Sequence, residues 1–254
     1  MKKIFFPLAM LMALAGCQEK KSDVQVSLEG RWMECRPDMP QLFQGVELKA
    51  GGQAASIGMS TLLYDKWKCE DGNLILSGKS LGNGQTIAFD DTLRIVRQTP
   101  DTLVLGRGGE ARWEYYRAET DPFVQAMDSL ERQLPEGQSL HREIYKGTLP
   151  AASGPGIEYT VVLFTPADSV DNGLFRLTMN YIDAENGEDQ LFLQQGELKG
   201  QRDRNAPEAT TVLRLQPYGD DESVYFEKQQ DGLLMLDRKG QVIQSDLNYK
   251  LKRW

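Results

Sequence analysis

Short runs of β-prone residues, each bounded by turn-forming residues, recur along most of this chain. In its first half they fall at residues 31–33, 45–48, 54–57, 61–68, 73–76, 85–96, 103–105 and 113–117. Pairs such as Asp71-Gly72, which separates two of these runs, favour tight turns between antiparallel strands. About eight short strands at this spacing predict an antiparallel sandwich or barrel over residues 27–120.

One segment departs from the β pattern and has the spacing of a helix. Asp121 followed by Pro122 is typical of a helix start, with an N-cap and proline at the first helical position. Apolar side chains then recur every three or four residues, as on one face of an amphipathic helix: Phe123, Met127, Leu130 and Leu134. We expect a linker helix within residues 121–137 that packs on a barrel; the alternative is a helix that docks a partner.

A second set of β-prone runs follows this helix and continues to the end of the chain. Residues 159–164 are rich in β-branched and aromatic side chains, and apolar residues alternate along 174–181. Two charged stretches are expected to be exposed loops: residues 183–189 and 200–208. The sequence therefore predicts an all-β protein of two consecutive small antiparallel barrels, the second over residues 138–254, joined by a short helix.

The first residues have the organisation of an export signal. Lys2 and Lys3 precede an apolar run at 4–14, which is shorter than the roughly 20 residues that a membrane-spanning helix needs. The run ends in Leu14-Ala15-Gly16-Cys17, which resembles the lipobox of bacterial lipoproteins. The alternatives are an ordinary secretory signal and an N-terminal anchor helix.

The lipobox resemblance implies cleavage before Cys17 and acylation of its thiol. Each buried methylene of an acyl chain contributes about 0.8 kcal/mol, so two or three chains would hold the protein on a membrane. We expect a signal peptide over residues 1–16 and a tether over residues 17–26. Gln18 rather than aspartate follows the cysteine, which in the lipoprotein-sorting pattern favours the outer membrane; the face that it occupies stays open.

The charge of the chain narrows the classes of partner. The formal net charge is −8, and loss of a leader with two lysines would make the protein more acidic. This balance argues against nucleic acid and against electrostatic binding to anionic lipid. The acidic pair Asp90-Asp91 and the acidic cluster 220–222 are expected to be solvated turns, because calcium needs more oxygen ligands in a shaped loop.

The residue types that carry catalysis are sparse. Acylation would use Cys17, and the sequence leaves open either a disulfide between Cys35 and Cys69 or two separate buried thiols. His141, the only histidine, stands in a linker without a serine or cysteine motif nearby. A nucleophile needs an oriented base, so we expect no catalytic residue, no metal site, no cofactor and no enzymatic activity.

The first half resembles the lipocalin-like domains of bacterial lipoproteins. The resemblance rests on Leu28-Glu29-Gly30-Arg31-Trp32, with its Gly-x-Trp, and on the run 78–86, Gly-Lys-Ser-Leu-Gly-Asn-Gly-Gln-Thr. It covers residues 27–118 and implies a lipocalin-like, calycin-type barrel in which the ring of Trp32 plugs one end.

The second half resembles the N-terminal barrel of the NlpE lipoproteins, which are tied to envelope stress signalling and copper tolerance. The matching pieces are 145–150, 156–158, 234–240 and 248–251, within residues 143–253. The family pattern has Cys-x-x-Cys after Leu149-Pro150, but Ala151 and Gly154 stand at those positions here. An alanine methyl and a glycine offer no ligand to Cu(I) or Zn, which puts a metal function in doubt.

These observations predict a non-catalytic envelope lipoprotein that acts as a binding or stress-sensing module. Its partners would be a membrane, through the lipid anchor, and another envelope protein. The alternative is a carrier of a small hydrophobic ligand in the first barrel. The small residues Ala54 and Ala55 and the short strands favour a filled interior, and hence weak or no binding.

Overall fold

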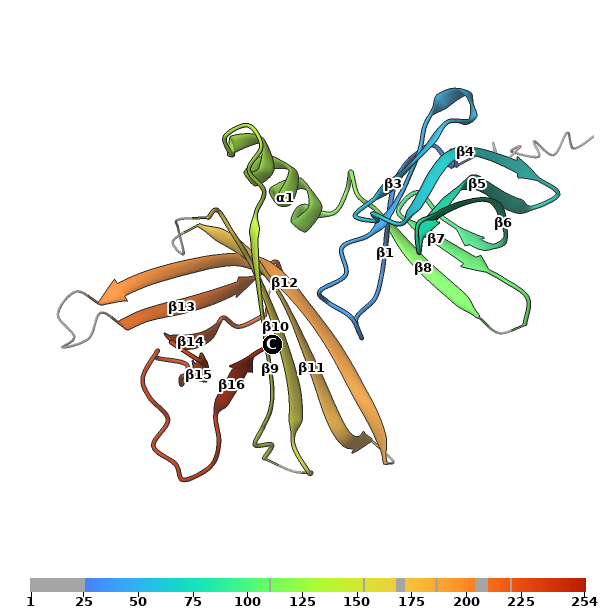
Figure 1. Cartoon of the computed structure of the whole chain (residues 1–254). Helices are drawn as coiled ribbons and strands as arrows, with labels where there is room; N and C mark the ends of the chain where they lie inside the picture. Colours follow the sequence, from blue (N-terminus) through green and yellow to red (C-terminus); the bar gives the residue numbers. More distant parts are fainter. Residues whose placement is uncertain are drawn as a thin grey trace, which may run out of the picture.

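A computed structural model describes residues 26–109, 111–152, 154–167, 172–185, 187–203, 210–219 and 221–254. Within these residues the chain forms two eight-stranded antiparallel sheets with one α-helix between them (Figure 1). The predicted fold class is confirmed, with one closed and one nearly closed barrel. The expected signal peptide and Cys17 lie outside the described residues.

No helix in the described part of the chain is both long and apolar enough to cross a membrane.

The first barrel is a sheet in which all neighbours but one are consecutive in the chain. Its strands are β1 (Gly30–Glu34), β2 (Gly45–Leu48), β3 (Ala54–Ile57), β4 (Leu62–Glu70), β5 (Asn73–Gly82), β6 (Gln85–Gln98), β7 (Thr102–Gly106) and β8 (Arg112–Arg117). Their order is β3-β2-β1-β8-β7-β6-β5-β4, so β3 and β4 are the two edges. A 3-10 turn, η1 (Ala50–Gly52), links β2 to β3.

The two edges of the first sheet meet through a side chain instead of a full backbone ladder. The Ser56 hydroxyl on β3 donates to the Leu62 carbonyl at 2.7 Å and accepts from the Tyr64 amide at 2.8 Å. One isolated bridge, between Gln53 and Lys66, lies next to it. The serine satisfies edge groups that would otherwise be exposed, so the barrel is nearly closed.

Trp32 fills one end of the first barrel, as the lipocalin-like resemblance implies. Its side chain is fully buried, and its indole N–H donates to the Leu28 carbonyl at 2.8 Å. The Arg117 guanidinium lies 4.2 Å from the centre of the indole ring, a cation–π contact. Leucines on β2, β5, β6 and β7 lie in the same core cluster as Trp32: Leu48, Leu74, Leu76, Leu93, Leu103 and Leu105.

The helix α1 (Pro122–Gln133) joins the barrels and begins where the sequence predicts. The Asp121 side chain caps it by accepting from the Val124 amide at 3.0 Å. Its apolar face packs on the outer surface of the second barrel: Phe123 and Met127 contact the cluster of Ile144, Val162, Phe164 and Leu174. On the other side, Asp128 accepts a bidentate hydrogen bond from Arg31 at 2.5 and 3.1 Å. The helix is therefore tied to both barrels.

The second barrel is fully closed. Its strands are β9 (His141–Leu149), β10 (Ile157–Thr165), β11 (Gly173–Glu185), β12 (Glu188–Asp203), β13 (Thr210–Pro217), β14 (Val224–Gln229), β15 (Gly232–Met235) and β16 (Lys250–Arg253). β9 pairs with both β16 and β10, which completes the ring. Its core holds twelve buried residues, with Tyr145, Phe175 and Phe226 the largest.

Candidate functional site

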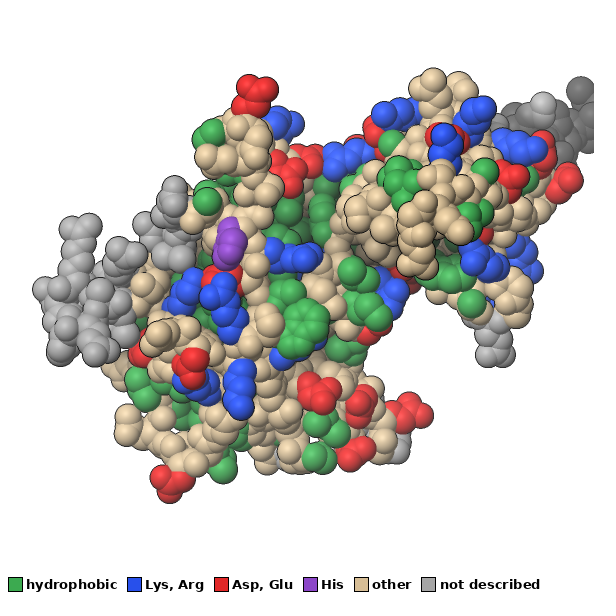
Figure 2. All heavy atoms as spheres, viewed as in Figure 1, with side chains coloured by type: hydrophobic (Ala, Val, Ile, Leu, Met, Phe, Trp, Pro, Cys, Tyr) green, Lys and Arg blue, Asp and Glu red, His purple; other side chains and the backbone are tan. Residues whose placement is uncertain are grey.

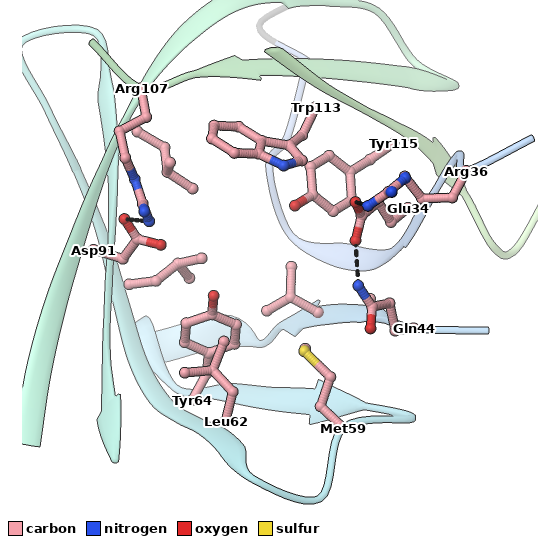
Figure 3. Close-up of a pocket in the computed structure, with 14 residues that line it drawn as sticks. Glu34, Arg36, Gln44, Met59, Leu62, Tyr64, Asp91, Arg107, Trp113 and Tyr115 are labelled. Carbon is pink, nitrogen blue, oxygen red and sulfur yellow. Dashed lines mark hydrogen bonds and ion pairs between the residues drawn. The ribbon is translucent and has the colours of Figure 1, made fainter. Parts of the chain in front are cut away.

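A cavity of about 230 Å³ lies in the first barrel, and Trp32 is not among the residues that line it (Figure 3). The sequence favours a barrel interior filled by side chains, and this prediction is wrong for the part of the first barrel that holds the cavity. The cavity is lined by residues from six strands and the loops beside them: Glu34, Arg36, Gln44, Gly45, Val46, Met59, Leu62, Tyr64, Leu76, Asp91, Leu93, Arg107, Trp113 and Tyr115. We call this site the mouth of the first barrel.

The inner part of the mouth is apolar. Val46, Leu76 and Leu93 are almost fully buried and line both the cavity and the core beneath it. Gly45 on β2 allows a close approach to β1, because a Cβ there would lie 2.1 Å from the Trp32 carbonyl oxygen. Together these residues form an apolar floor, on which the nonpolar part of a ligand would gain free energy from leaving water.

Glu34 brings a carboxylate into the mouth. Side chains alternate along β1, so Glu34 lies on the same face as Trp32 and is only 8% exposed. One oxygen accepts from the Gln44 amide at 2.6 Å, and the other lies 3.5 Å from a nitrogen of Arg36. The Arg36 guanidinium makes its better contacts with exposed Asp38, at 2.8 and 3.0 Å.

A second carboxylate, Asp91, faces the mouth from β6. Its partner is Arg107, whose guanidinium forms an ion pair with it and lies 5.6 Å from the centre of the Trp113 ring. The acidic pair Asp90-Asp91 is expected to be a solvated turn, and that prediction is wrong. Both residues lie in the middle of β6, and Asp90 accepts from the Ser77 hydroxyl on β5 at 2.5 Å.

Two tyrosine hydroxyls complete the polar lining. Burial raises the pKa of Tyr64 to about 12, and the nearby charge of Asp91 adds to this. Burial also raises the pKa of Tyr115, and the charge of Glu34 raises it further. Both hydroxyls are therefore neutral near pH 7 and can donate or accept hydrogen bonds. The mouth thus combines an apolar floor, aromatic walls and a polar rim, which suits a small amphipathic molecule.

The loop between β1 and β2, residues 35–44, connects the mouth to the second barrel. Arg176 on β11, which is 2% exposed, donates to the carbonyl of Leu42 at 3.1 Å and to that of Pro40 at 3.5 Å. It also donates to the Tyr116 hydroxyl on β8 at 3.1 Å. One guanidinium therefore fixes the loop that carries Arg36 and ends at Gln44.

Comparisons with known proteins agree with this division into two barrels. A lipocalin-like family model matches residues 24–118, and the model of the NlpE N-terminal domain matches residues 145–246. A solved lipocalin-like protein from Bacteroides thetaiotaomicron VPI-5482 is 46% identical over 36% of this chain and 96% of its own, with a TM-score of 0.33. No curated protein matches the chain.

The chain belongs to the lipocalin-like family through its first barrel. The NlpE model matches the second barrel, so both resemblances that the sequence indicates are confirmed. The mouth lies entirely in the lipocalin-like barrel. The filled core of Tyr145, Phe175 and Phe226 lies in the NlpE-type barrel.

The structure leaves the two described cysteines of the lipocalin-like barrel unbridged. Cys35 and Cys69 are free thiols, so the disulfide that the sequence leaves open is not formed. Cys35 is half-buried at the start of the loop 35–44, and burial raises the pKa of its thiol. Cys69 is exposed on β4, so the alternative of two buried thiols does not describe it.

The second barrel departs from the NlpE pattern at the β9–β10 loop. Gly154 has φ of +93°, a left-handed conformation that favours glycine. A cysteine at this position would be strained, which fits the missing Cys-x-x-Cys. Across the described residues, no three His, Cys, Asp or Glu side chains gather as a metal site would require. His141 is exposed at the first position of β9 (Figure 2).

Sequence reasoning does not find the residues of the mouth. Glu34 lies on β1, Asp91 on β6 and Arg107 just after β7, and each is an isolated charge in the sequence or part of a pair that resembles a turn. The alternation along β1 after Trp32 is the one signal available, because it places Glu34 on the inward face.

Proposed function

We propose that this protein is a non-catalytic binding module of the bacterial envelope. A lipid on Cys17 would hold it on the outer membrane, and the mouth of the first barrel would bind a small amphipathic ligand. The observation that carries this proposal is the cavity of about 230 Å³, with its apolar floor and polar rim. The family matches support a lipocalin-fold binding module.

The size of the cavity limits the ligand. Sites for drug-sized molecules occupy roughly 300–1,000 Å³, so a cavity of about 230 Å³ suits one ring or a short chain. A long acyl chain would not fit this cavity. The alternative of a hydrophobic-ligand carrier is therefore limited to small molecules. The closed second barrel, whose core is filled by side chains, would serve as a scaffold or as a surface for a partner.

A binding titration with a blocking variant tests this proposal. Small aromatic probes are titrated into the chain from Gln18 onward, and binding is measured by calorimetry. Val46→Phe should fill part of the cavity and abolish binding, whereas Val242→Phe, at an exposed site in the second barrel, should leave it intact. Unchanged binding in a folded Val46→Phe variant would place the ligand elsewhere.

The lipid anchor has its own test. Cys17→Ser should release the protein from the outer-membrane fraction, because the acidic chain offers little attraction to anionic lipid. Continued sedimentation of the variant with outer membrane would contradict anchoring through Cys17.

A second candidate function is the stress-sensing role that the NlpE resemblance implies. The match over residues 145–246 favours it. Overproduction of the chain should then activate an envelope-stress reporter, and the Cys17→Ser variant should alter that response. A reporter that responds to neither protein would count against this role.

A further inference from the structure

The buried Glu34 carboxylate in the mouth shares its cationic partner, Arg36, with Asp38. The Glu34 carboxylate is 8% exposed, but its closest donor is the neutral amide of Gln44 at 2.6 Å. Arg36 lies 3.5 Å away and directs its bidentate hydrogen bonds to Asp38 instead. A buried charge is costly unless it is paired, so Glu34 would gain from a cation placed in the cavity.

Asp91 offers a second carboxylate whose present partner can be replaced. The side chain of Asp91 is 13% exposed, whereas that of Arg107 is 57% exposed. Arg107 therefore reaches the mouth from the solvent side on a long, flexible side chain. It can return to water when a ligand cation arrives, at little cost in solvation. Figure 3 places the Asp91–Arg107 pair and Glu34 on different sides of the cavity.

The aromatic walls also favour positive charge. Trp113, Tyr64 and Tyr115 line the cavity, and ring faces attract cations, Trp most strongly. Glu34 and Asp91 both act to raise the pKa of Tyr115, against a weaker opposing effect of Arg107. Both carboxylates therefore act on the aromatic wall, with Arg36 and Arg107 as their ion-pair partners.

Resting on the proposed function, we infer that the mouth selects a small organic cation: an amine with one ring or a short apolar body. Its ammonium group pairs with Glu34, and its apolar body lies on Val46, Leu76 and Leu93 among the aromatic rings. A carboxylate of the same shape is rejected, because it would enter beside buried Glu34 and half-buried Asp91.

Three probes of similar shape but different charge test this selectivity. The chain from Gln18 onward is titrated with 2-phenylethylamine, 2-phenylethanol and 3-phenylpropanoate near pH 7 in low salt, by calorimetry. We expect the amine to bind at least tenfold more tightly than the alcohol, and the carboxylate to bind more weakly than both.

Removal of the buried carboxylate should erase the preference for the amine. Glu34→Gln, which keeps the side-chain size, should lower amine affinity at least tenfold and leave the affinity for the alcohol unchanged. The matched control is Glu114→Gln on β8, an exposed acid paired with Arg97, which should change neither. Asp38→Asn is a second test variant. It frees Arg36 to pair with Glu34, so it should lower the affinity for the amine several-fold.

The outcomes separate the inference from the proposed function. Equal affinity for amine and alcohol, or a preference that survives Glu34→Gln, overturns cation selection but leaves the mouth as a binding site. Tighter binding of the carboxylate overturns it as well and assigns selectivity to Arg36 and Arg107. If none of the probes binds, the proposed function fails together with the inference.

Discussion

At the scale of single residues, Trp32 does most to define the first barrel. The ring is fully buried, donates to the Leu28 carbonyl at 2.8 Å and carries Arg117 over its face at 4.2 Å. It packs in the same core cluster as Val46, Leu76 and Leu93, which line the cavity, so the cavity floor depends on it.

Truncation of Trp32 should therefore strongly destabilise the lipocalin-like barrel. Large-to-small changes of a buried aromatic residue cost about 3–5 kcal/mol, and Trp32→Ala should fall in that range in denaturant unfolding. Trp32→Phe keeps most of the packing but loses the hydrogen bond to Leu28, so its cost should be smaller. Trp254, which is 72% exposed, provides the control: Trp254→Ala should change stability little.

The NlpE-type barrel should lack a tight copper site. Cu(I) prefers thiolate and thioether ligands, and Ala151 and Gly154 supply neither. The measurement is a Cu(I) titration of the full chain with Cys35→Ser and Cys69→Ser, under reducing conditions. We expect no one-to-one complex tighter than about micromolar, or about −8.2 kcal/mol; such a complex would mean that oxygen or methionine ligands replace the missing cysteines.

At the scale of elements, α1 is short but held at several points. Asp121 caps its N-terminus, and the same carboxylate accepts from the Gln195 amide on β12 at 3.1 Å. The helix is therefore positioned by the second barrel as well as by its own sequence.

Loss of this cap should loosen the junction. Asp121→Ala removes the bond to the Val124 amide, and N-cap losses cost about 1 kcal/mol. Hydrogen exchange should become faster in the first turn of α1, whereas Asp121→Asn should retain much of the protection. Equal exchange in all three proteins would show that packing alone holds the helix.

Helices and strands could be predicted from the sequence where one face of the element is buried. The helix start at Asp121 and the alternation along 174–181 follow from local spacing, and both lie where expected. The prediction that the charged stretches 183–189 and 200–208 are loops is wrong in part, because β11 runs to Glu185 and β12 runs from Glu188 to Asp203. Residues 186 and 204–208 lie outside the described part of the chain. The strand ends are paired in a ladder, but the sequence there lacks the apolar alternation that marks a buried face.

The candidate site was less predictable for a related reason. Its charges become neighbours only when strands distant in sequence close into a barrel. Glu34 and Asp91 carry no local motif, and nothing in the sequence around Asp91 separates an inward carboxylate from a solvated turn.

At the scale of the whole molecule, the two barrels have separate cores, but the junction is shared. The helix α1 covers Ile144, Val162, Phe164 and Leu174 on the second barrel. Both positive and negative side chains lie on the face drawn in Figure 2.

Each half should fold alone if the division respects this packing. Fragments 24–118 and 119–254 should both unfold cooperatively, because each buries its own core. Fragment 138–254, which lacks α1, should be less stable than 119–254, because the apolar patch under the helix becomes exposed. Equal stability of these two fragments in denaturant would contradict a structural role for the helix.

Methyl NMR of the full chain tests most directly whether the mouth of the first barrel binds a small ligand. With Leu and Val methyl groups labelled, addition of 2-phenylethylamine should shift the signals of Val46, Leu76 and Leu93, which line the cavity. The methyl signals of Leu213 and Leu215, in the filled core of the second barrel, should stay in place. Shifts confined to the second barrel, or no shifts at all at millimolar probe, would contradict the account.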